Sequence, residues 1–385
     1  MKQKNLLLLA LAAAFYFTGC QKDRAPDCTG SNVTLTTTSK VIYVGLNDPR
    51  GLKFGPDGNL YVAEGGIGGT NSTAGICAQV PSSGPGPYLG SNTGSRISKI
   101  DWNGVRTTVA DNLPSSMSSP ASGSGISGVA DVEFIGNTLY GLLTGAGCSH
   151  GVANIPNGIF KVNPDKTWTM VANISQFLMS HPVAHPDPDD FEPDGTPYSM
   201  VNVNGNLYVT QPNQQEIDRV VPSNGNISRI VDISVLNNGS DGHWIGPTSM
   251  VHHDGNFYFG TLTPFPIVQG AAAVYKMSPN GSYSVYASGF TMILGVAFDD
   301  NNNLYVLENT VGQPGPTPGF GDVVRVTPSG QRQIVVSGLH LPTAMAFGPD
   351  GKLYISDWGI GPPGLGQIVQ VSFKCEYVGA DTHSN

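Results

Sequence analysis

Charged side chains are scarce in this sequence: Asp, Glu, Lys and Arg make up 12% of its 385 residues, about half the share found in an ordinary soluble domain. Only 19 residues are Lys or Arg, against 28 Asp or Glu, and the basic residues form no cluster. Because phosphate contacts need clustered cations, we expect no nucleic-acid partner. Helical periodicity is also missing, which excludes a helix bundle. In contrast, 50 Gly and 29 Pro indicate many short strands joined by tight turns.

No apolar run near the N-terminus is long enough to span a membrane. The run at residues 6–17 is shorter than the ~20 residues that a spanning helix needs. It follows two lysines and ends at small residues, which is the pattern of a secretory signal. The segment from Phe17 to Cys20 resembles the bacterial lipobox, in which the cysteine becomes the lipid-modified first residue. We therefore expect residues 1–19 to be a lipoprotein signal peptide; a plain signal peptide with an incidental cysteine is the alternative.

Lipidation would place the chain in the cell envelope. Gln21 follows Cys20, where an Asp would favour retention in the inner membrane. We therefore expect an outer-membrane lipoprotein, on the periplasmic side or at the cell surface, whose only membrane contact is its lipid anchor. The polar, aperiodic residues 20–39 are predicted to be a flexible tether, residues 40–375 the folded domain and residues 376–385 a C-terminal tail.

An internal repeat predicts the architecture. A Leu-Tyr or Phe-Tyr pair recurs six times, and an Asx-Gly turn signal, typical of tight hairpins, precedes most of the pairs. An apolar strand comes before each turn, and two more strands around a second turn follow each pair. Six units of four short strands predict an all-β chain folded as a six-bladed β-propeller. The pairs begin at Leu60, Leu139, Leu207, Phe257, Leu304 and Leu353.

The phase of the repeat predicts how the ring closes. After the last Leu-Tyr pair the chain supplies only one further strand, residues 367–373, so the sixth blade lacks its outer strand. One surplus strand precedes the first blade, within residues 33–44. We expect this N-terminal strand to complete the last blade, which would protect two sheet edges from aggregation.

Four cysteines follow Cys20, namely Cys28, Cys77, Cys148 and Cys375. An even number in an oxidising compartment indicates two disulfides. Counting alone leaves three pairings open. Closure of the ring would bring the chain ends together, which favours Cys28 with Cys375. Cys77 and Cys148, in loops of adjacent blades, would form the other pair.

Several segments carry a family resemblance. Residues 48–64 resemble the NHL-type propeller repeat. Residues 258–266, 286–290 and 338–343 are similar to the ScyD/ScyE family, named after a cyanobacterial sunscreen-pigment gene cluster. The resemblance spans residues 40–373 and implies the propeller fold. It implies no activity, because the family has no settled biochemical function.

Nearly all extra chain length falls in connections that share one face of such a ring. These are the loops between the second and third strands of a blade and the loops between blades. Long loops gathered on one face of a repeat protein usually build its binding face; tolerated surface insertion is the alternative. We expect a monomer that binds an unknown small molecule or protein there. The loops span residues 65–94, 114–128, 145–156, 175–197, 237–246, 310–321 and 359–366.

One residue of each repeat, four positions past the Leu or Phe, is predicted to end the second strand at the channel mouth. Three of these residues are acidic, and converging carboxylates repel one another unless a cation binds. Because Ca²⁺ takes oxygen ligands, we expect it at Glu64, Glu308 and Asp357. Gln211 and Thr261 would contact a bound ligand. A mouth that merely holds water is the alternative. The column reads Glu64, Leu143, Gln211, Thr261, Glu308 and Asp357.

Two shorter motifs match known functional patterns only in part. Residues 147–151 read Gly-Cys-Ser-His-Gly, the nucleophile-elbow pattern, but residues 152–156 do not begin the helix which that motif needs. Residues 190–195 have the oxygen spacing of half a calcium loop, but Val201 stands where the last ligand should be. We interpret both segments as turns.

Three functions are compatible with these observations. The first is a non-enzymatic, lipid-anchored propeller that binds a ligand or protein through its long-loop face. The second is a cation-dependent hydrolase or lyase, similar to lactonases on related propellers, with its site at the channel mouth. A quinone-dependent sugar dehydrogenase is a third, weaker option. We find no His or Asn set at the positions of the lactonase metal ligands, so the sequence favours the binding protein.

Overall fold

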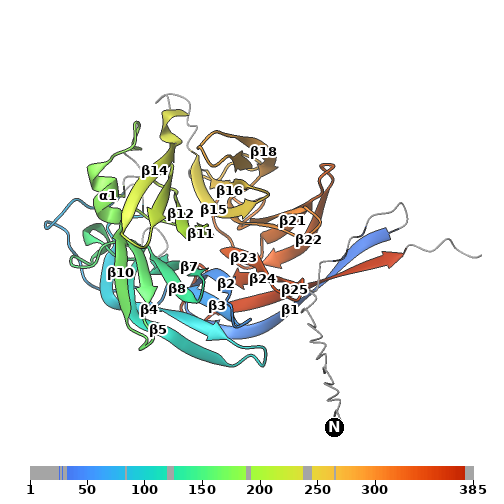
Figure 1. Cartoon of the computed structure of the whole chain (residues 1–385), viewed down its shortest axis with the longest axis horizontal. Helices are drawn as coiled ribbons and strands as arrows, with labels where there is room; N and C mark the ends of the chain where they lie inside the picture. Colours follow the sequence, from blue (N-terminus) through green and yellow to red (C-terminus); the bar gives the residue numbers. More distant parts are fainter. Residues whose placement is uncertain are drawn as a thin grey trace, which may run out of the picture.

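The computed structural model describes Pro26, Cys28 and residues 33–82, 85–118, 125–187, 192–236, 245–263 and 266–377. Cys20 and the predicted signal peptide lie outside these residues. The described chain is almost entirely β-structure, arranged as six small antiparallel sheets around a central axis (Figure 1). The six-bladed propeller predicted from the repeat is therefore confirmed.

Blades 1 to 3 follow one another along the chain, and each begins with its innermost strand. Blade 1 carries a short fifth strand at its outer edge. The strands are β2 (Pro49–Phe54), β3 (Leu60–Glu64), β4 (Leu89–Ile100), β5 (Arg106–Met117) and β6 (Ile126–Ser127) in blade 1, β7 (Val129–Ile135), β8 (Thr138–Leu143), β9 (Gly158–Val162) and β10 (Trp168–Asn173) in blade 2, and β11 (Met200–Val203), β12 (Asn206–Gln211), β13 (Glu216–Val221) and β14 (Asn226–Asp232) in blade 3.

Blades 4 to 6 complete the ring, and the last of them takes its outermost strand from the N-terminal part of the chain. The strands are β15 (Gly246–His253), β16 (Asn256–Leu262), β17 (Ala272–Met277) and β18 (Tyr283–Phe290) in blade 4, β19 (Ile293–Phe298), β20 (Leu304–Glu308), β21 (Gly321–Val326) and β22 (Arg332–Leu339) in blade 5, and β23 (Ala344–Phe347), β24 (Leu353–Asp357), β25 (Gly366–Tyr377) and β1 (Val33–Leu46) in blade 6.

The Asx-Gly signals form the turns between first and second strands. Asn204 and Gly205, which join β11 to β12, both have positive φ angles, +53° and +80°. Asp254 and Gly255 repeat this geometry between β15 and β16, with φ of +46° and +73°. Positive φ at both central residues matches the twist of a two-residue hairpin. These turns lie at the end of the ring opposite the long loops.

The hydrophobic core consists of six apolar clusters, one at each seam between neighbouring blades. Leu307 and Val323 of blade 5, for example, pack with Leu353 and Ile355 of blade 6. Both faces of each sheet are covered by a neighbour, which explains the apolar character of the second and third strands. Apolar packing between neighbouring blades therefore holds the ring together, and the cluster between blade 6 and blade 1 closes it.

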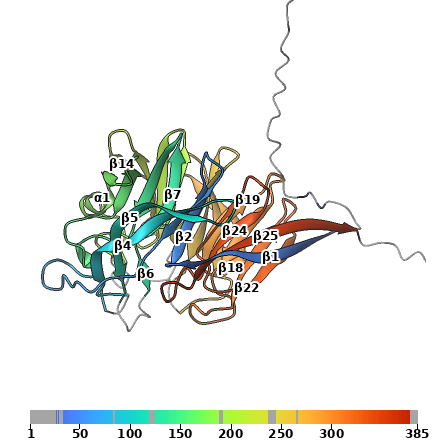
Figure 2. The ribbon, with the colours of Figure 1, turned by 90° about the horizontal axis from the view of Figure 1, so that it is seen from below.

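The N-terminal strand closes the ring as predicted. β1 pairs antiparallel with β25, from Val33 opposite Tyr377 to Leu46 opposite Gly366, and the two strands lie side by side and project from the ring (Figures 1 and 2). Both are longer than expected, so residues 33–39, predicted as tether, belong to a strand. Side chains on this outer strand are largely exposed, so a polar sequence is compatible with it.

Two disulfides have the pairing inferred from ring closure. Cys28 is bonded to Cys375 and Cys77 to Cys148. The first bond joins the two ends of the propeller, and Cys375 lies within β25 instead of after it. The second joins the loop after β3 to the loop after β8, and thus links blades 1 and 2.

The connections in the described part of the chain contain three short helical segments, none expected from the sequence. They are η2 (Cys148–His150), α1 (Ile174–Ser180) and η3 (Ser234–Leu236). The side chain of Asn173 caps α1 by accepting the backbone N–H of Gln176. No helix in the described part of the chain is long and apolar enough to cross a membrane.

Candidate functional site

Glu64 ends β3 and is fully buried inside blade 1. Its carboxylate accepts the backbone N–H of Asn47 at 2.8 Å and the hydroxyl of Ser98 at 2.5 Å. Arg106 forms an ion pair with it at 2.5 Å, and Arg96 lies 4.0 Å away. Blade 1 itself therefore provides the hydrogen bonds and the positive charge that this buried carboxylate needs.

Glu308 and Asp322 form a pair of buried carboxyl groups in blade 5. They face each other in the register of β20 and β21, and Glu308 accepts the backbone N–H of Thr291 at 2.5 Å. Burial, followed by the charge of Asp322, raises the pKa of Glu308 to about 8. Burial raises the pKa of Asp322 to about 6. Two such groups share a proton near neutral pH, so a cation is not needed to relieve their repulsion.

Asp357 ends β24 and is also buried within its own blade. Its Oδ1 accepts the backbone N–H of His340 at 2.7 Å, and its Oδ2 accepts the amide of Gln367 at 2.8 Å. The imidazole Nδ1 of His340 lies 3.7 Å from the same carboxylate. Burial raises the pKa of Asp357 against the effect of these hydrogen bonds.

The other residues of the column also contact neighbouring protein groups and do not form a shared site. Gln211 is buried, and its amide nitrogen lies 3.5 Å from Asp218. The hydroxyl of Thr261 exchanges hydrogen bonds with the backbone of Ala273 at 3.0 and 3.1 Å. Leu143 packs into the apolar cluster between blades 1 and 2.

The structure therefore does not bring Glu64, Glu308 and Asp357 together as cation ligands. Within the described residues, no three His, Cys, Asp or Glu side chains form a group that could hold a metal ion. The reason is radial position: the innermost strand of each blade separates the second strand from the channel. The calcium-loop-like residues 190–195 lie partly outside the described residues.

A cavity of about 870 Å³ occupies the central channel instead. The innermost strands of all six blades line it, and its wall is more apolar than polar. This volume falls in the range of about 300–1,000 Å³ that is typical of small-molecule sites. Four methionines contribute to the wall: Met200, Met250, Met292 and Met345.

The cavity reaches the long-loop face of the ring. Every blade contributes to its rim a residue at or after the end of its second strand, and the connection before blade 3 adds residues 192, 196 and 197. The predicted loops 65–94, 175–197, 310–321 and 359–366 contribute to this rim, whereas Thr144, Pro212 and Leu262 lie outside the predicted loops. One such residue from each blade, in chain order, is Tyr88, Thr144, Pro212, Leu262, Pro316 and Ile360.

Asp131, in β7, is an acidic group in the cavity wall. Its Oδ1 accepts the backbone N–H of Val132 and its Oδ2 that of Met200, each at 2.8 Å. Burial raises its pKa to about 7 in spite of these bonds. A Cβ on Gly51 would lie 1.9 Å from Oδ1, so β2 can approach this acid only because residue 51 is glycine.

Arg50 and Tyr198 lie beside Asp131 in the same wall. Arg50 is the second residue of β2, and its Nη2 donates to the backbone carbonyl of Ile126. The Tyr198 hydroxyl donates to the carbonyl of Thr343 at 2.7 Å, a bond that links blade 3 to blade 6. Burial, with the charge of Asp131, raises the pKa of Tyr198 above its ordinary value while Arg50 opposes the shift. The phenol therefore keeps its proton.

Deeper in the cavity, Lys53 and Glu133 form an ion pair at 2.7 Å. Glu133 also accepts the backbone N–H of Asn202 at 3.3 Å. Sequence reasoning missed this charged wall. The available signal was that a chain with few charges places Arg50, Lys53, Asp131 and Glu133 in the innermost strands of only two neighbouring blades.

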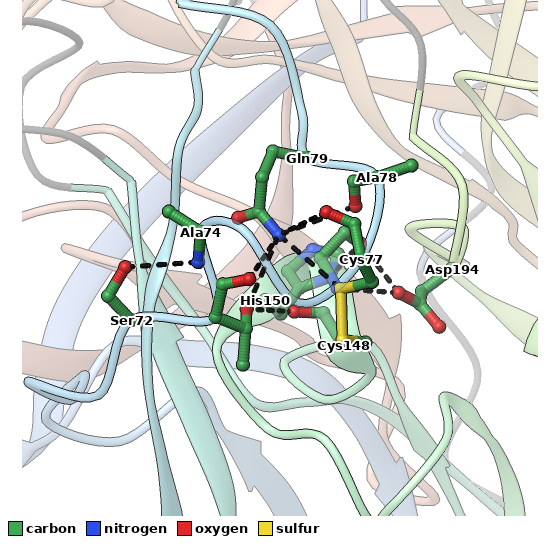
Figure 3. Close-up of a disulfide and its surroundings, with 10 residues drawn as sticks. Ser72, Ala74, Cys77, Ala78, Gln79, Cys148, His150 and Asp194 are labelled. Atoms are coloured by element: carbon green, nitrogen blue, oxygen red, sulfur yellow. Dashed lines mark hydrogen bonds between the residues drawn. A yellow bond between two sulfur atoms is a disulfide. The ribbon is translucent and has the colours of Figure 1, made fainter.

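The Cys77–Cys148 disulfide joins the loop after β3 to the loop after β8 (Figure 3). The side-chain amide of Gln79 donates to the carbonyls of Thr73 and Cys77, each at 3.1 Å. The hydroxyl of Thr73 donates to the carbonyl of Cys148. These bonds tie the loop after β3, which carries Tyr88, to blade 2.

The nucleophile-elbow match is a buried structural turn. Ser149 donates its hydroxyl and its backbone N–H to Asp194, both at 2.7 Å. The His150 ring packs on Tyr88 with centroids 4.4 Å apart, and its Nε2 lies 3.5 Å from Glu192. Burial lowers the pKa of His150 to about 4. Ser149 and His150 are fully buried, so the hydroxyl cannot reach a substrate.

Comparison with known proteins establishes the fold alone. No family model and no curated protein matches the chain. A solved protein of unknown function from Bacteroides thetaiotaomicron has a TM-score of 0.53 and 12% identity, covering 89% of this chain and 77% of that one. A gluconolactonase from Xanthomonas campestris has a TM-score of 0.49 and 10% identity, covering 91% and 97%. A streptogramin B lyase has a TM-score of 0.43 and 14% identity, covering 89% and 98%.

Proposed function

We propose that this chain is an exported binding protein that holds a small, mainly apolar molecule in its central cavity. The observation that carries the proposal is the cavity of about 870 Å³, lined by all six innermost strands and rimmed by a residue of every blade. Small-molecule sites in proteins are concave, mostly apolar and supplied with a few polar groups. Here Arg50, Asp131 and Tyr198 supply those polar groups.

The binding role is favoured over the hydrolase or lyase that the sequence left open. That alternative placed a cation, with Ca²⁺ as the candidate, on Glu64, Glu308 and Asp357. These carboxyl groups are held inside their own blades and do not line the cavity. The resemblance of the repeat motifs supports our proposal that the chain is a member of the ScyD/ScyE family.

The cavity is tested by a substitution that fills it. Ala344 lines the cavity and is only partly buried, so Ala344→Phe should occupy part of its volume. Wild-type protein should bind Nile red, a neutral apolar dye, with saturable fluorescence, and Ala344→Phe should weaken this binding at least tenfold. Ala271→Phe, at an exposed site outside the cavity, should bind like the wild type. Equal binding by all three proteins, or none by the wild type, would contradict the proposal.

The two disulfides indicate an exported protein, because such bonds form in oxidising compartments. We further propose that Cys20 is lipid-modified and anchors the propeller to the outer membrane. Labelled palmitate should attach to the wild type and not to Cys20→Ser. Cys28→Ser serves as the control and should keep the label. Labelling of Cys20→Ser would rule out lipidation at this cysteine.

A further inference from the structure

Arg50 differs from three other basic residues, each of which pairs with a buried glutamate. Arg106 pairs with Glu64, Arg229 with Glu216 and Lys53 with Glu133. Arg50 lines the cavity and has no carboxylate within 4.0 Å in the described part of the chain. Its one hydrogen bond to protein, from Nη2 to Ile126, leaves the other guanidinium donors without a protein acceptor there.

Two buried acids, Asp48 and Asp131, do not fully neutralise Arg50. Asp48 is buried, accepts the backbone N–H of Gly361 at 3.2 Å, and has a pKa raised by burial to about 7 although Arg50 opposes the shift. Asp131 uses both carboxylate oxygens on backbone N–H groups and also has a pKa of about 7. Near neutral pH each acid carries only part of a negative charge, so these two acids leave the charge of Arg50 partly unneutralised.

Much of the wall away from Arg50 is apolar, although the Lys53–Glu133 pair, Asp187 and Glu192 also line the cavity. Methionines from blades 3 to 6 line it together with Leu52 and Leu294, and methionine side chains adapt to varied ligand shapes. An arginine binds a carboxylate through two parallel hydrogen bonds, which makes it well suited to this group. The cavity therefore offers a binding point for an acid and an apolar surface for the rest of the molecule.

We infer that the cavity binds an organic anion, with the carboxylate of the ligand on Arg50 and its apolar body against the methionine-lined wall. This inference rests on the proposed binding function and gives its ligand a chemical class. Arg50 is then the specificity-determining residue, because it distinguishes an acid from a neutral molecule of the same shape.

Octanoate and 1-octanol test the inference, since they share an apolar chain and differ in charge. Both are titrated against Nile red bound to the wild type at pH 6.5. Octanoate should displace the dye at lower concentration than 1-octanol. Arg50→Gln should weaken octanoate about 10- to 100-fold, the usual effect of losing a hydrogen-bonded charge partner, and should change 1-octanol by less than about twofold. Arg50→Lys should recover part of the loss, because it restores the charge without the two-pronged geometry.

Arg332→Gln is the matched control, because Arg332 is exposed on the outer strand β22 and lies outside the cavity. It should bind both probes like the wild type. If 1-octanol displaces the dye as well as octanoate does, or if Arg50→Gln leaves octanoate unchanged, the inference is wrong while the cavity remains a binding site. If Nile red itself does not bind, or binds Ala344→Phe equally well, the proposed function fails together with the inference.

Discussion

Replacing both Cys28 and Cys375 with serine should lower the free energy of unfolding by about 2–5 kcal/mol. The bond joins residues 347 positions apart, so it restricts almost the whole unfolded chain. It also fixes β1 against β25 at the projecting end of blade 6 (Figure 2). Without it, the outermost strand can separate from the ring and expose the edge of β25. Urea titration under oxidising conditions, followed by circular dichroism, measures the loss.

The second disulfide supplies the matched comparison. Cys77 and Cys148 are only 71 positions apart, so the chain-entropy model makes their contribution smaller by about 1.4 kcal/mol. Their double serine variant should therefore unfold at a higher urea concentration than the first variant. It should also weaken binding in the cavity, because the loop that carries Tyr88 loses its link to blade 2. Equal losses of stability in the two variants would show that ring closure has no special role.

The fold was predictable because the repeat is visible in short local signals. Asn204-Gly205 and Asp254-Gly255 fix two hairpins by their own backbone preferences. Counting strands against blades was enough to assign the closing role of β1. The ends of β1 and β25 were not predictable, because residues 33–39 are polar and become a strand only through pairing with a partner over three hundred residues away.

The positions of the acidic residues along their strands were predictable, but the neighbours of their side chains were not. The repeat places Glu64, Glu308 and Asp357 at the ends of their strands, as expected. Which neighbour meets each side chain depends on packing between strands, and here Arg106, among others, meets Glu64 inside the blade. Arg50 carried no motif of its own. Its proposed role follows from its place on an innermost strand and from the absence of a carboxylate partner among the described residues.

A rise in pH from 6.5 to 8.5 should destabilise the folded protein. Burial holds the pKa of Glu308 at about 8 and that of Glu216 at about 9, and those of Asp48 and Asp131 at about 7. Unfolded carboxyl groups have lost their protons by pH 6.5. The folded state therefore binds more protons across this window, and its free energy of unfolding falls as the pH rises. His150, whose pKa is lowered, acts in the opposite direction, but mainly below about pH 7, because the unfolded imidazole loses its proton near that pH.

Glu308→Gln should remove part of this pH dependence. The variant should be more stable than the wild type at pH 8.5, and its advantage should exceed that at pH 6.5 by on the order of 2 kcal/mol, because an amide replaces a carboxylate that repels Asp322 across the strand pair. At pH 6.5 the variant should already be the more stable protein, since the wild type must take up a proton at Glu308 when it folds and the amide needs none. Glu376→Gln, at an exposed site beside Lys374, should follow the wild type at both pH values. Urea titrations at the two pH values provide the measurement. A variant that is less stable than the wild type at pH 8.5 would mean that Glu308 is ionised and stabilised in the folded state, and that the carboxyl pair does not share a proton.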